Sequence, residues 1–298
     1  MIPGMLLPRF EYEAPRDLRE AVGLVAEGDE RTHLLAGGTD LLVKMKRGLL
    51  RPRRVISLGR VQGLDRIEPQ ENGSLKVGAL TTMSQLAVHP VLEGQWSALA
   101  EGAASVGGPI IRNRATVGGN VINARPCADT LPPLIALGAR LHLEGPRGGR
   151  KIALDGFVQG PGETRIAPHE ILSTLEIPTA TGEAGSAYLK ITRRRAMEVT
   201  IVGCAASLEI APDGGHVQRA RLVFTSVAPI PLRVQEAEAL LEGELPEEKT
   251  LAAAARVARE RAQPIDDHRA IGRYRSEMVE VTALRTLRTA LSRARRSR

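Results

Sequence analysis

A chain of 298 residues is long enough for two or three domains that each bury a core, which excludes a peptide-sized binding module. Hydrophobic residues make up 43% of the chain but aromatic residues only 2%, so the cores must be aliphatic. The formal net charge of +7 raises the question of a nucleic-acid partner, yet proteins that bind single strands stack bases on aromatic side chains. We therefore expect no nucleic-acid partner, and interpret the basic clusters as solvated surface or as charge that neutralises a phosphate-bearing cofactor or an acidic subunit.

The sequence also disfavours a membrane-spanning protein and a protein stabilised by disulfides. No segment has the roughly 18 to 20 consecutive apolar residues of a membrane helix, and the first ten residues lack the apolar core of a signal peptide. We expect a cytoplasmic protein without a membrane span. Cys127 and Cys204 are the only cysteines and lack CxxC spacing. Neither a disulfide framework nor a metal or iron–sulfur site built from the chain's own thiolates is expected.

The first fifty-odd residues predict a small α/β unit. Apolar residues in 16–27 recur with the period of an amphipathic helix, and a short apolar strand over 32–38 follows. A second helix is predicted over 40–46 and a second strand over 54–58.

The middle of the chain predicts an α+β unit. Asn72-Gly73 separates two alternating runs and favours a β-hairpin, because both residues tolerate the positive φ of a tight turn. Helices are expected over 82–88 and 96–106, and strands over 139–145 and 171–178.

The last third predicts a sheet covered by helices. The segment 178–186 is rich in Gly, Thr, Ala and Pro and is interpreted as a linker. Two strands joined at Asp213-Gly214 follow it. Helical patterns then occupy 234–243, 247–262 and 276–296, and no repeat of fixed period is present.

Two glycine pairs follow apolar runs, in "LLAGGTD" and in "RATVGGN". Glycine tolerates positive φ and has no side chain, so such a turn exposes consecutive N–H groups that can hold a phosphate. One pair alone is more often only a turn, but two loops can hold a dinucleotide diphosphate from both sides. The predicted donors are Gly37, Gly38, Thr39 and Asp40 in the first loop and Thr116, Gly118, Gly119 and Asn120 in the second.

Neither a GxGxxG nor a GxxxxGK[ST] motif accompanies these loops, so Rossmann and P-loop folds lack support. Asp129 follows the second loop and allows two interpretations. It caps a helix whose first turn contains Pro132 and Pro133, or it accepts a hydrogen bond from a ligand hydroxyl.

Four segments together resemble the FAD-binding medium subunit of molybdenum hydroxylases, the family of the flavin subunits of xanthine dehydrogenase, carbon monoxide dehydrogenase and 4-hydroxybenzoyl-CoA reductase. They are "LLAGGTDLLVKMKRG", "SVGGPIIRNRATVGGNVINARPCADTLPPLIALGA", "EILSTLEIP" and "SAYLKITRRRAMEVTIVGCAASLEI". The similarity runs through nearly the whole chain in the same order.

The resemblance implies an α+β fold with a two-subdomain FAD-binding domain of the vanillyl-alcohol-oxidase type. A C-terminal domain of a three-stranded antiparallel sheet with helices, like that of carbon monoxide dehydrogenase flavoproteins, completes it. The expected boundaries are 1–57 and 58–177 for the two FAD-binding subdomains and 178–298 for the C-terminal domain.

The resemblance also implies a site for non-covalent FAD. The two glycine loops would hold the diphosphate, and Leu41 and Ile122 would lie against the isoalloxazine ring. The implied cofactor-binding residues are Leu35, Ala36, Gly37, Gly38, Thr39, Asp40, Leu41, Thr116, Gly118, Gly119, Asn120, Ile122, Asp129, Leu172 and Lys190. Lys190 with Arg193 to Arg195 would stabilise the reduced flavin.

The sequence departs from parts of the family. It lacks the four-cysteine insertion of the 4-hydroxybenzoyl-CoA reductase type, so an extra cluster is not expected, and Cys204 is interpreted as a core residue. Thr39-Asp40 favours the xanthine-dehydrogenase-like branch. Some relatives carry an aromatic residue near the flavin in the segment after "YLK". This sequence has "AMEVTIV" there, which leaves Tyr188 as the only nearby aromatic candidate.

In such enzymes the chain would be an electron-transfer subunit without catalytic or metal-binding residues of its own, because the cofactor performs the redox chemistry. Electrons would pass from molybdopterin in a large subunit through [2Fe–2S] clusters in a small subunit to the flavin of this chain. The three subunits would assemble as a dimer of heterotrimers. Two alternatives stay open: a stand-alone FAD-dependent oxidase or dehydrogenase, and a basic binding module.

Overall fold

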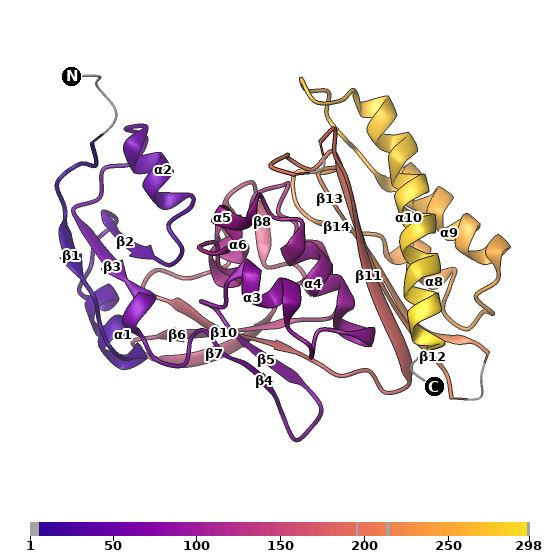
Figure 1. The fold of residues 1–298 in the computed structure, drawn as a ribbon, viewed down its shortest axis with the longest axis horizontal. Coiled ribbons are helices and arrows are strands. Elements are labelled where there is room, and N and C mark those ends of the chain that lie inside the picture. The colour runs from indigo at the N-terminus through magenta and orange to yellow at the C-terminus, as the bar shows by residue number, and fades with distance from the viewer. Residues whose placement is uncertain (1–5, 195, 213–214, 297–298) are drawn as a thin grey trace.

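The computed structural model describes residues 6–194, 196–212 and 215–296, in three units that follow one another along the chain (Figure 1). The first unit lies at one end of the molecule, the second in the middle, and the C-terminal unit at the other end. The predicted turn at Asp213-Gly214, Arg195 of the basic cluster and the last two residues of the tail lie outside the described residues.

The first unit is a parallel sheet of order β1-β3-β2, formed by β1 (Glu11–Glu13), β2 (Thr32–Leu35) and β3 (Arg54–Ser57). Helix α1 (Leu18–Ala26) begins where the Asp17 side chain accepts from the Glu20 amide, as expected of an N-cap. Helix α2 (Leu41–Lys46) and the single turn η1 (Leu58–Arg60) follow β2 and β3. The predicted α/β unit is confirmed.

The second unit contains a five-stranded antiparallel sheet of order β4-β5-β10-β6-β7. The strands are β4 (Ile67–Pro69), β5 (Leu75–Gly78), β6 (Arg140–Gly145), β7 (Gly148–Ala153) and β10 (Ile171–Ile177). The predicted hairpin joins β4 to β5, with Gly73 at φ 78° and the Asn72 side chain accepting from the Ser74 amide. A short pair, β8 (Val158–Gly160) and β9 (Glu163–Thr164), lies apart from this sheet in hydrogen bonding.

Short helices pack with this sheet around one aliphatic core. They are α3 (Met83–Val88), η2 (Gly94–Trp96), α4 (Ser97–Ala104), α5 (Pro109–Arg112), α6 (Val117–Asn123) and α7 (Leu131–Ala136). Helix α3 begins with a capping box in which Thr82 and Gln85 bond each other's backbone amides. The low aromatic content is thus met by Leu, Val and Ala packing, as the composition predicts.

The C-terminal unit has β11 (Glu183–Ile191), β12 (Val202–Ile210), β13 (Val217–Thr225) and β14 (Leu232–Arg233), in that order across one antiparallel sheet. Helices α8 (Gln235–Ala239) and α10 (Gly272–Ala294) pack on it, and α9 (Glu248–Arg261) packs on both of these helices (Figure 1). The expected three-stranded sheet therefore has a fourth, two-residue strand, which polar Arg233 made hard to detect in the sequence.

The predicted linker is only partly a connection, because β11 begins at Glu183 and pairs from there with Ile210 of β12. A Cβ on Gly185 would lie 2.3 Å from the Ala290 carbonyl oxygen of α10. The small residues that suggested a linker therefore permit close packing of helix on strand.

None of the described helices combines the length and the hydropathy that a bilayer-spanning segment requires.

Candidate functional site

A cavity of about 780 Å³ opens between the first and second units. All predicted site residues except Leu35, Asp129 and Lys190 line it. The structure adds residues that the sequence did not indicate: His33, Leu34, Lys44, Leu50, Leu58, Ala79, Leu80, Val106, Ile111, Ala115, Asn123, Arg125, Pro161, Gly162, Ile166 and Ile171. Of these residues, Lys44 had the clearest sequence signal, since it lies in the basic run that follows the first glycine loop.

The two glycine loops, Ala36–Asp40 and Thr116–Asn120, meet in this cavity although about eighty residues separate them in the chain. A Cβ on Gly37 would lie 1.9 Å from the Arg114 carbonyl oxygen, so only glycine permits this approach. A Cβ on Gly119 would lie 4.0 Å from the Ala36 Cβ. The predicted convergence of the two motifs on one site is present in the structure.

The first glycine loop leaves its amides available. Gly38 has a φ of 77°, in the left-handed region that favours glycine. Within the described chain, the N–H groups of Gly37, Gly38, Thr39 and Asp40 have no hydrogen-bond acceptor. These are the four donors predicted for this loop, and they can serve an anionic ligand in the cavity.

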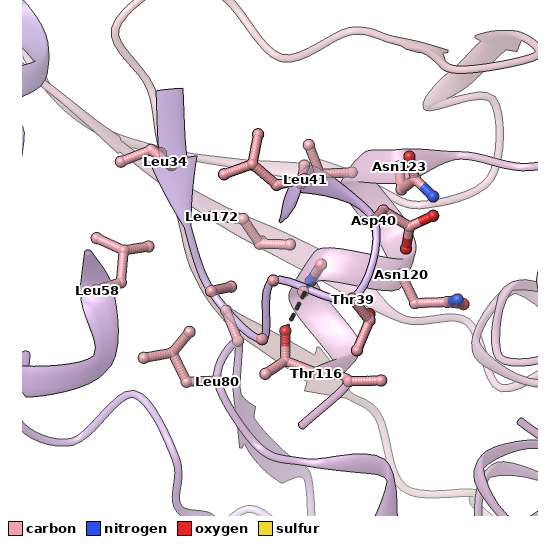
Figure 2. A pocket seen from close by; sticks show the side chains of 18 of the residues that line it. Leu34, Thr39, Asp40, Leu41, Leu58, Leu80, Thr116, Asn120, Asn123 and Leu172 are labelled. Atoms are coloured by element: carbon pink, nitrogen blue, oxygen red, sulfur yellow. Dashed lines mark hydrogen bonds between the residues drawn. The ribbon is translucent and has the colours of Figure 1, made fainter. Parts of the chain in front are cut away.

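The second glycine loop uses its amides internally. The Gly118 amide donates to the Ala79 carbonyl at 2.8 Å, and the Asn120 amide donates to the Thr116 carbonyl at 3.0 Å. The Gly119 amide donates to the Thr116 hydroxyl at 3.1 Å, the dashed bond in Figure 2. Because Thr116 caps α6, these N–H groups are already satisfied. Among the described residues, three of the four donors predicted for this loop, the amides of Gly118, Gly119 and Asn120, bond within the chain, and the Thr116 amide has no acceptor. The loop therefore presents fewer free amides to the cavity than predicted, and contributes its side chains and its shape.

Polar and apolar side chains lie on different sides of the cavity. Figure 2 shows Leu34, Leu58 and Leu80 on one side and Asp40 and Asn120 on the other. Such a cavity suits a ligand with both an apolar ring and a polar or anionic part. With the free amides of the first loop, this arrangement fits a flavin dinucleotide.

Basic side chains add positive charge to the cavity. Lys44 of α2 and Arg125 both line the cavity. Burial, followed by the charge of Lys44, lowers the pKa of His33, so this histidine is neutral near pH 7. The cations therefore come from Lys44 and Arg125.

Asp129 and Lys190 lie in a buried network outside the cavity lining. Asp129 accepts hydrogen bonds from the Tyr188 hydroxyl at 2.7 Å, the Thr200 hydroxyl at 2.6 Å and Lys190 Nζ at 2.7 Å. Lys190 Nζ also donates to the Ser105 carbonyl at 3.0 Å. Burial raises the pKa of Asp129 in spite of the neighbouring Lys190 charge.

This network joins the second unit to β11 of the C-terminal unit. It overturns the interpretation of Asp129 as a helix cap, because Thr130 holds the N-cap position of α7. Tyr188 is buried, and its hydroxyl faces Asp129, so this aromatic side chain does not line the cavity.

Among the residues described, no group of three or more His, Cys, Asp or Glu side chains is placed to hold a metal ion. Cys204 is fully buried in β12 and burial raises the pKa of its thiol, in agreement with a core role.

Comparisons with known proteins divide the chain into two parts. A family model described as the FAD binding domain in molybdopterin dehydrogenase matches residues 8–180, and one described as the CO dehydrogenase flavoprotein C-terminal domain matches residues 187–290. The chain is 32% identical to the xanthine dehydrogenase FAD-binding subunit of Escherichia coli O157:H7, over 95% of this chain and 96% of that protein. It is also 32% identical to the carbon monoxide dehydrogenase medium chain of Hydrogenophaga pseudoflava, over 97% and 99%.

Solved structures agree over almost the full length. A chain of carbon monoxide dehydrogenase from Hydrogenophaga pseudoflava superposes with a TM-score of 0.91 at 33% identity, covering 97% of this chain and 99% of that one. A chain of quinoline 2-oxidoreductase from Pseudomonas putida 86 superposes with a TM-score of 0.87 at 27% identity, covering 98% and 99%.

Proposed function

The chain belongs to the family of FAD-binding subunits of molybdenum hydroxylases, and we propose that it takes electrons from [2Fe–2S] clusters of a partner subunit and passes them to an external acceptor. One observation carries this proposal: the free amides of the first glycine loop lie in a cavity that also has an apolar side. Bound FAD supplies the redox chemistry, and the chain supplies binding, orientation and electrostatics.

In this proposal the amides of Gly37 to Asp40 bind the FAD diphosphate without a covalent bond, and Lys44 and Arg125 offset its charge. The second glycine loop supplies the Asn120 side chain and closes the opposite wall. Leu41 and Ile122 supply apolar contacts for the ring system, as the family resemblance implies, and Leu172 is a further contact of the cofactor.

We keep Leu35, Asp129 and Lys190 in the proposed site as residues that support the cavity wall. Leu35 directly precedes Ala36 of the first loop. Lys190 holds the Ser105 carbonyl, and the next residue, Val106, lines the cavity. A basic residue close to this wall would favour a reduced, anionic cofactor.

The proposed assembly contains a molybdopterin-binding large subunit and an iron–sulfur small subunit, arranged with this chain as a dimer of heterotrimers in the cytoplasm. The support is that the chain matches medium chains of carbon monoxide dehydrogenases, and that one solved relative is described as a Cu,Mo enzyme. The same proposal divides the chain at residues 57 and 177 into two FAD-binding subdomains and a C-terminal domain.

The test is a visible absorption spectrum of the purified chain, followed by identification of the cofactor released on denaturation. We expect flavin bands and about one FAD freed without proteolysis, as a non-covalent one-site model requires. Co-expression with candidate molybdenum and iron–sulfur subunits should give a complex in which the substrate bleaches the flavin. A chain that stays colourless and takes up no added FAD would contradict the proposal, and a chain that oxidises a substrate alone would favour a stand-alone oxidase.

A further inference from the structure

The side chain of Asn120 lines the cavity from the second glycine loop, in which the amides of Gly118, Gly119 and Asn120 are already bonded. Its usefulness to an anionic ligand depends on which end of its amide faces the cavity. The Nδ2 group donates hydrogen bonds, whereas Oδ1 only accepts them and would repel a phosphate. Something must therefore fix the orientation of this amide.

Thr130 makes the contact that fixes it. The Thr130 hydroxyl lies 2.7 Å from Asn120 Oδ1 and donates to it. Thr130 is fully buried, and within the described residues its hydroxyl proton has no other acceptor. Because a buried hydroxyl rarely goes without a partner, the satisfied arrangement places Oδ1 toward Thr130 and leaves Nδ2 for the cavity.

The sequence around Thr130 explains why its hydroxyl is available. Threonine at an N-cap normally accepts a hydrogen bond from an amide in the first turn of its helix. In α7 the second and third helical positions are Pro132 and Pro133, which have no N–H, and Thr130 makes no side-chain cap. The hydroxyl is thus free to serve Asn120 instead of the helix.

We propose that Thr130 is a positioning residue that orients the Asn120 amide so that Nδ2 donates to the diphosphate of the bound cofactor. The inference rests on the proposed FAD function and adds to it a specific residue outside the cavity lining. It also links the cavity to the Asp129 network, because Thr130 and Asp129 are adjacent in the chain.

The test is a double-mutant cycle on FAD affinity, measured by quenching of flavin fluorescence on the full-length apoprotein. Asn120→Ala should weaken FAD binding about tenfold, the loss of a hydrogen bond to a charged group. Thr130→Val should weaken FAD binding about fivefold. Thr130→Ser should keep the wild-type affinity, because serine keeps the hydroxyl. In the Asn120→Ala background, Thr130→Val should change affinity less than about twofold.

Thr282→Val is the matched control, since Thr282 is equally buried but donates within α10, away from the cavity. It should leave FAD affinity unchanged, and thermal unfolding of each variant separates misfolding from weaker binding. Additive effects of the two substitutions, or an equal loss in Thr130→Ser, would overturn the inference while FAD binding by the wild-type chain still supports the proposed function. Wild-type affinity in Asn120→Ala would also overturn it, without bearing on whether the chain is a flavoprotein.

Discussion

The first glycine loop keeps four amides free, whereas the second loop, with the same Gly-Gly pair, bonds its amides to Thr116 and Ala79. The difference arises from the segments beside each pair. Thr116 caps α6 and pairs with Thr82 in an isolated bridge, so the second loop is closed by its own neighbours. A Gly-Gly pair after an apolar run therefore indicates close backbone approach, and only its surroundings decide whether its amides are donors for a ligand.

The comparison has a thermodynamic consequence. Amides without partners are stabilised when a ligand accepts from them, so cofactor binding should order and stabilise the first loop more than the second. In the second loop the amides of Gly118, Gly119 and Asn120 are already bonded before the cofactor binds. Substitutions in the first loop should therefore lower mainly FAD affinity, whereas substitutions in the second loop should lower mainly the free energy of unfolding.

The largest effect is expected for Gly37→Ala. Its Cβ would overlap the Arg114 carbonyl, which lies in the backbone and cannot move independently, so the two loops must separate. We expect FAD affinity to fall by a factor on the order of a hundred or more, because ligand geometry tolerates little displacement. The measurement is an FAD titration of the apoprotein. Gly23→Ala in α1 is the matched control, since no atom lies within 4 Å of its Cβ, and a similar loss there would remove the steric explanation.

Lys190→Ala tests whether the wall behind the cavity depends on the C-terminal unit. Removing one partner of a buried ion pair lowers the free energy of unfolding by about 3 kcal/mol, because the Asp129 carboxylate is left without its cation. Chemical denaturation near pH 7 measures this loss. Lys151→Ala breaks a pair with an exposed lysine and should change stability by less than about 1 kcal/mol.

The same variant should show a defined pH dependence. Burial already raises the pKa of Asp129 above 3.8, and loss of Lys190 raises it further. A carboxyl group whose folded pKa is raised stabilises the fold least when ionised, so the deficit should shrink as pH falls toward the raised pKa and grow above it. Asp129→Asn in the Lys190→Ala background should remove this dependence. If the stability lost in Lys190→Ala did not depend on pH, the charge of Asp129 would not be its cause.

Gly38→Ala should have an intermediate effect. At a φ of 77° a side chain costs about 1 kcal/mol, and its Cβ would also press on Leu35 and Leu42 at 3.0 Å. Gly48→Ala provides the comparison, because Gly48 has a φ of 70° with no atom within 4 Å of its Cβ. We expect Gly38→Ala to lose at least as much stability as Gly48→Ala, and only Gly38→Ala to lose FAD affinity. Equal affinities would show that the first loop does not contact the cofactor.

The smallest effect is expected for Thr116→Val, which removes the cap of α6 and should lower the free energy of unfolding by about 1 kcal/mol. It also removes the acceptor of the Gly119 amide, so that an amide of the second loop becomes free like those of the first loop. Thr82→Val removes a similar cap from α3, outside the cavity lining, and should match it in stability. A decrease in FAD affinity for Thr116→Val that exceeds that for Thr82→Val would show that the second loop's geometry matters to the cofactor.

The sequence by itself determined the order of units and the two loops. Local signals suffice for these: the periodicity of α1, the Asn72-Gly73 hairpin and the glycine pairs depend on neighbouring residues alone. Resemblance to a family then indicated twelve of the residues that line the cavity, because long motifs keep their order along the chain.

Only the tertiary structure decided how each loop uses its amides, since the acceptor of Gly118 is Ala79, far away in sequence. It also decided that Asp129 joins Lys190 and Tyr188 in a buried network, and that Gly185 packs beneath a helix. These features depend on hydrogen bonds and contacts between segments that no local pattern specifies. Local patterns determine which backbone shapes a segment can adopt, whereas packing between distant segments determines which of its polar groups remain for a ligand.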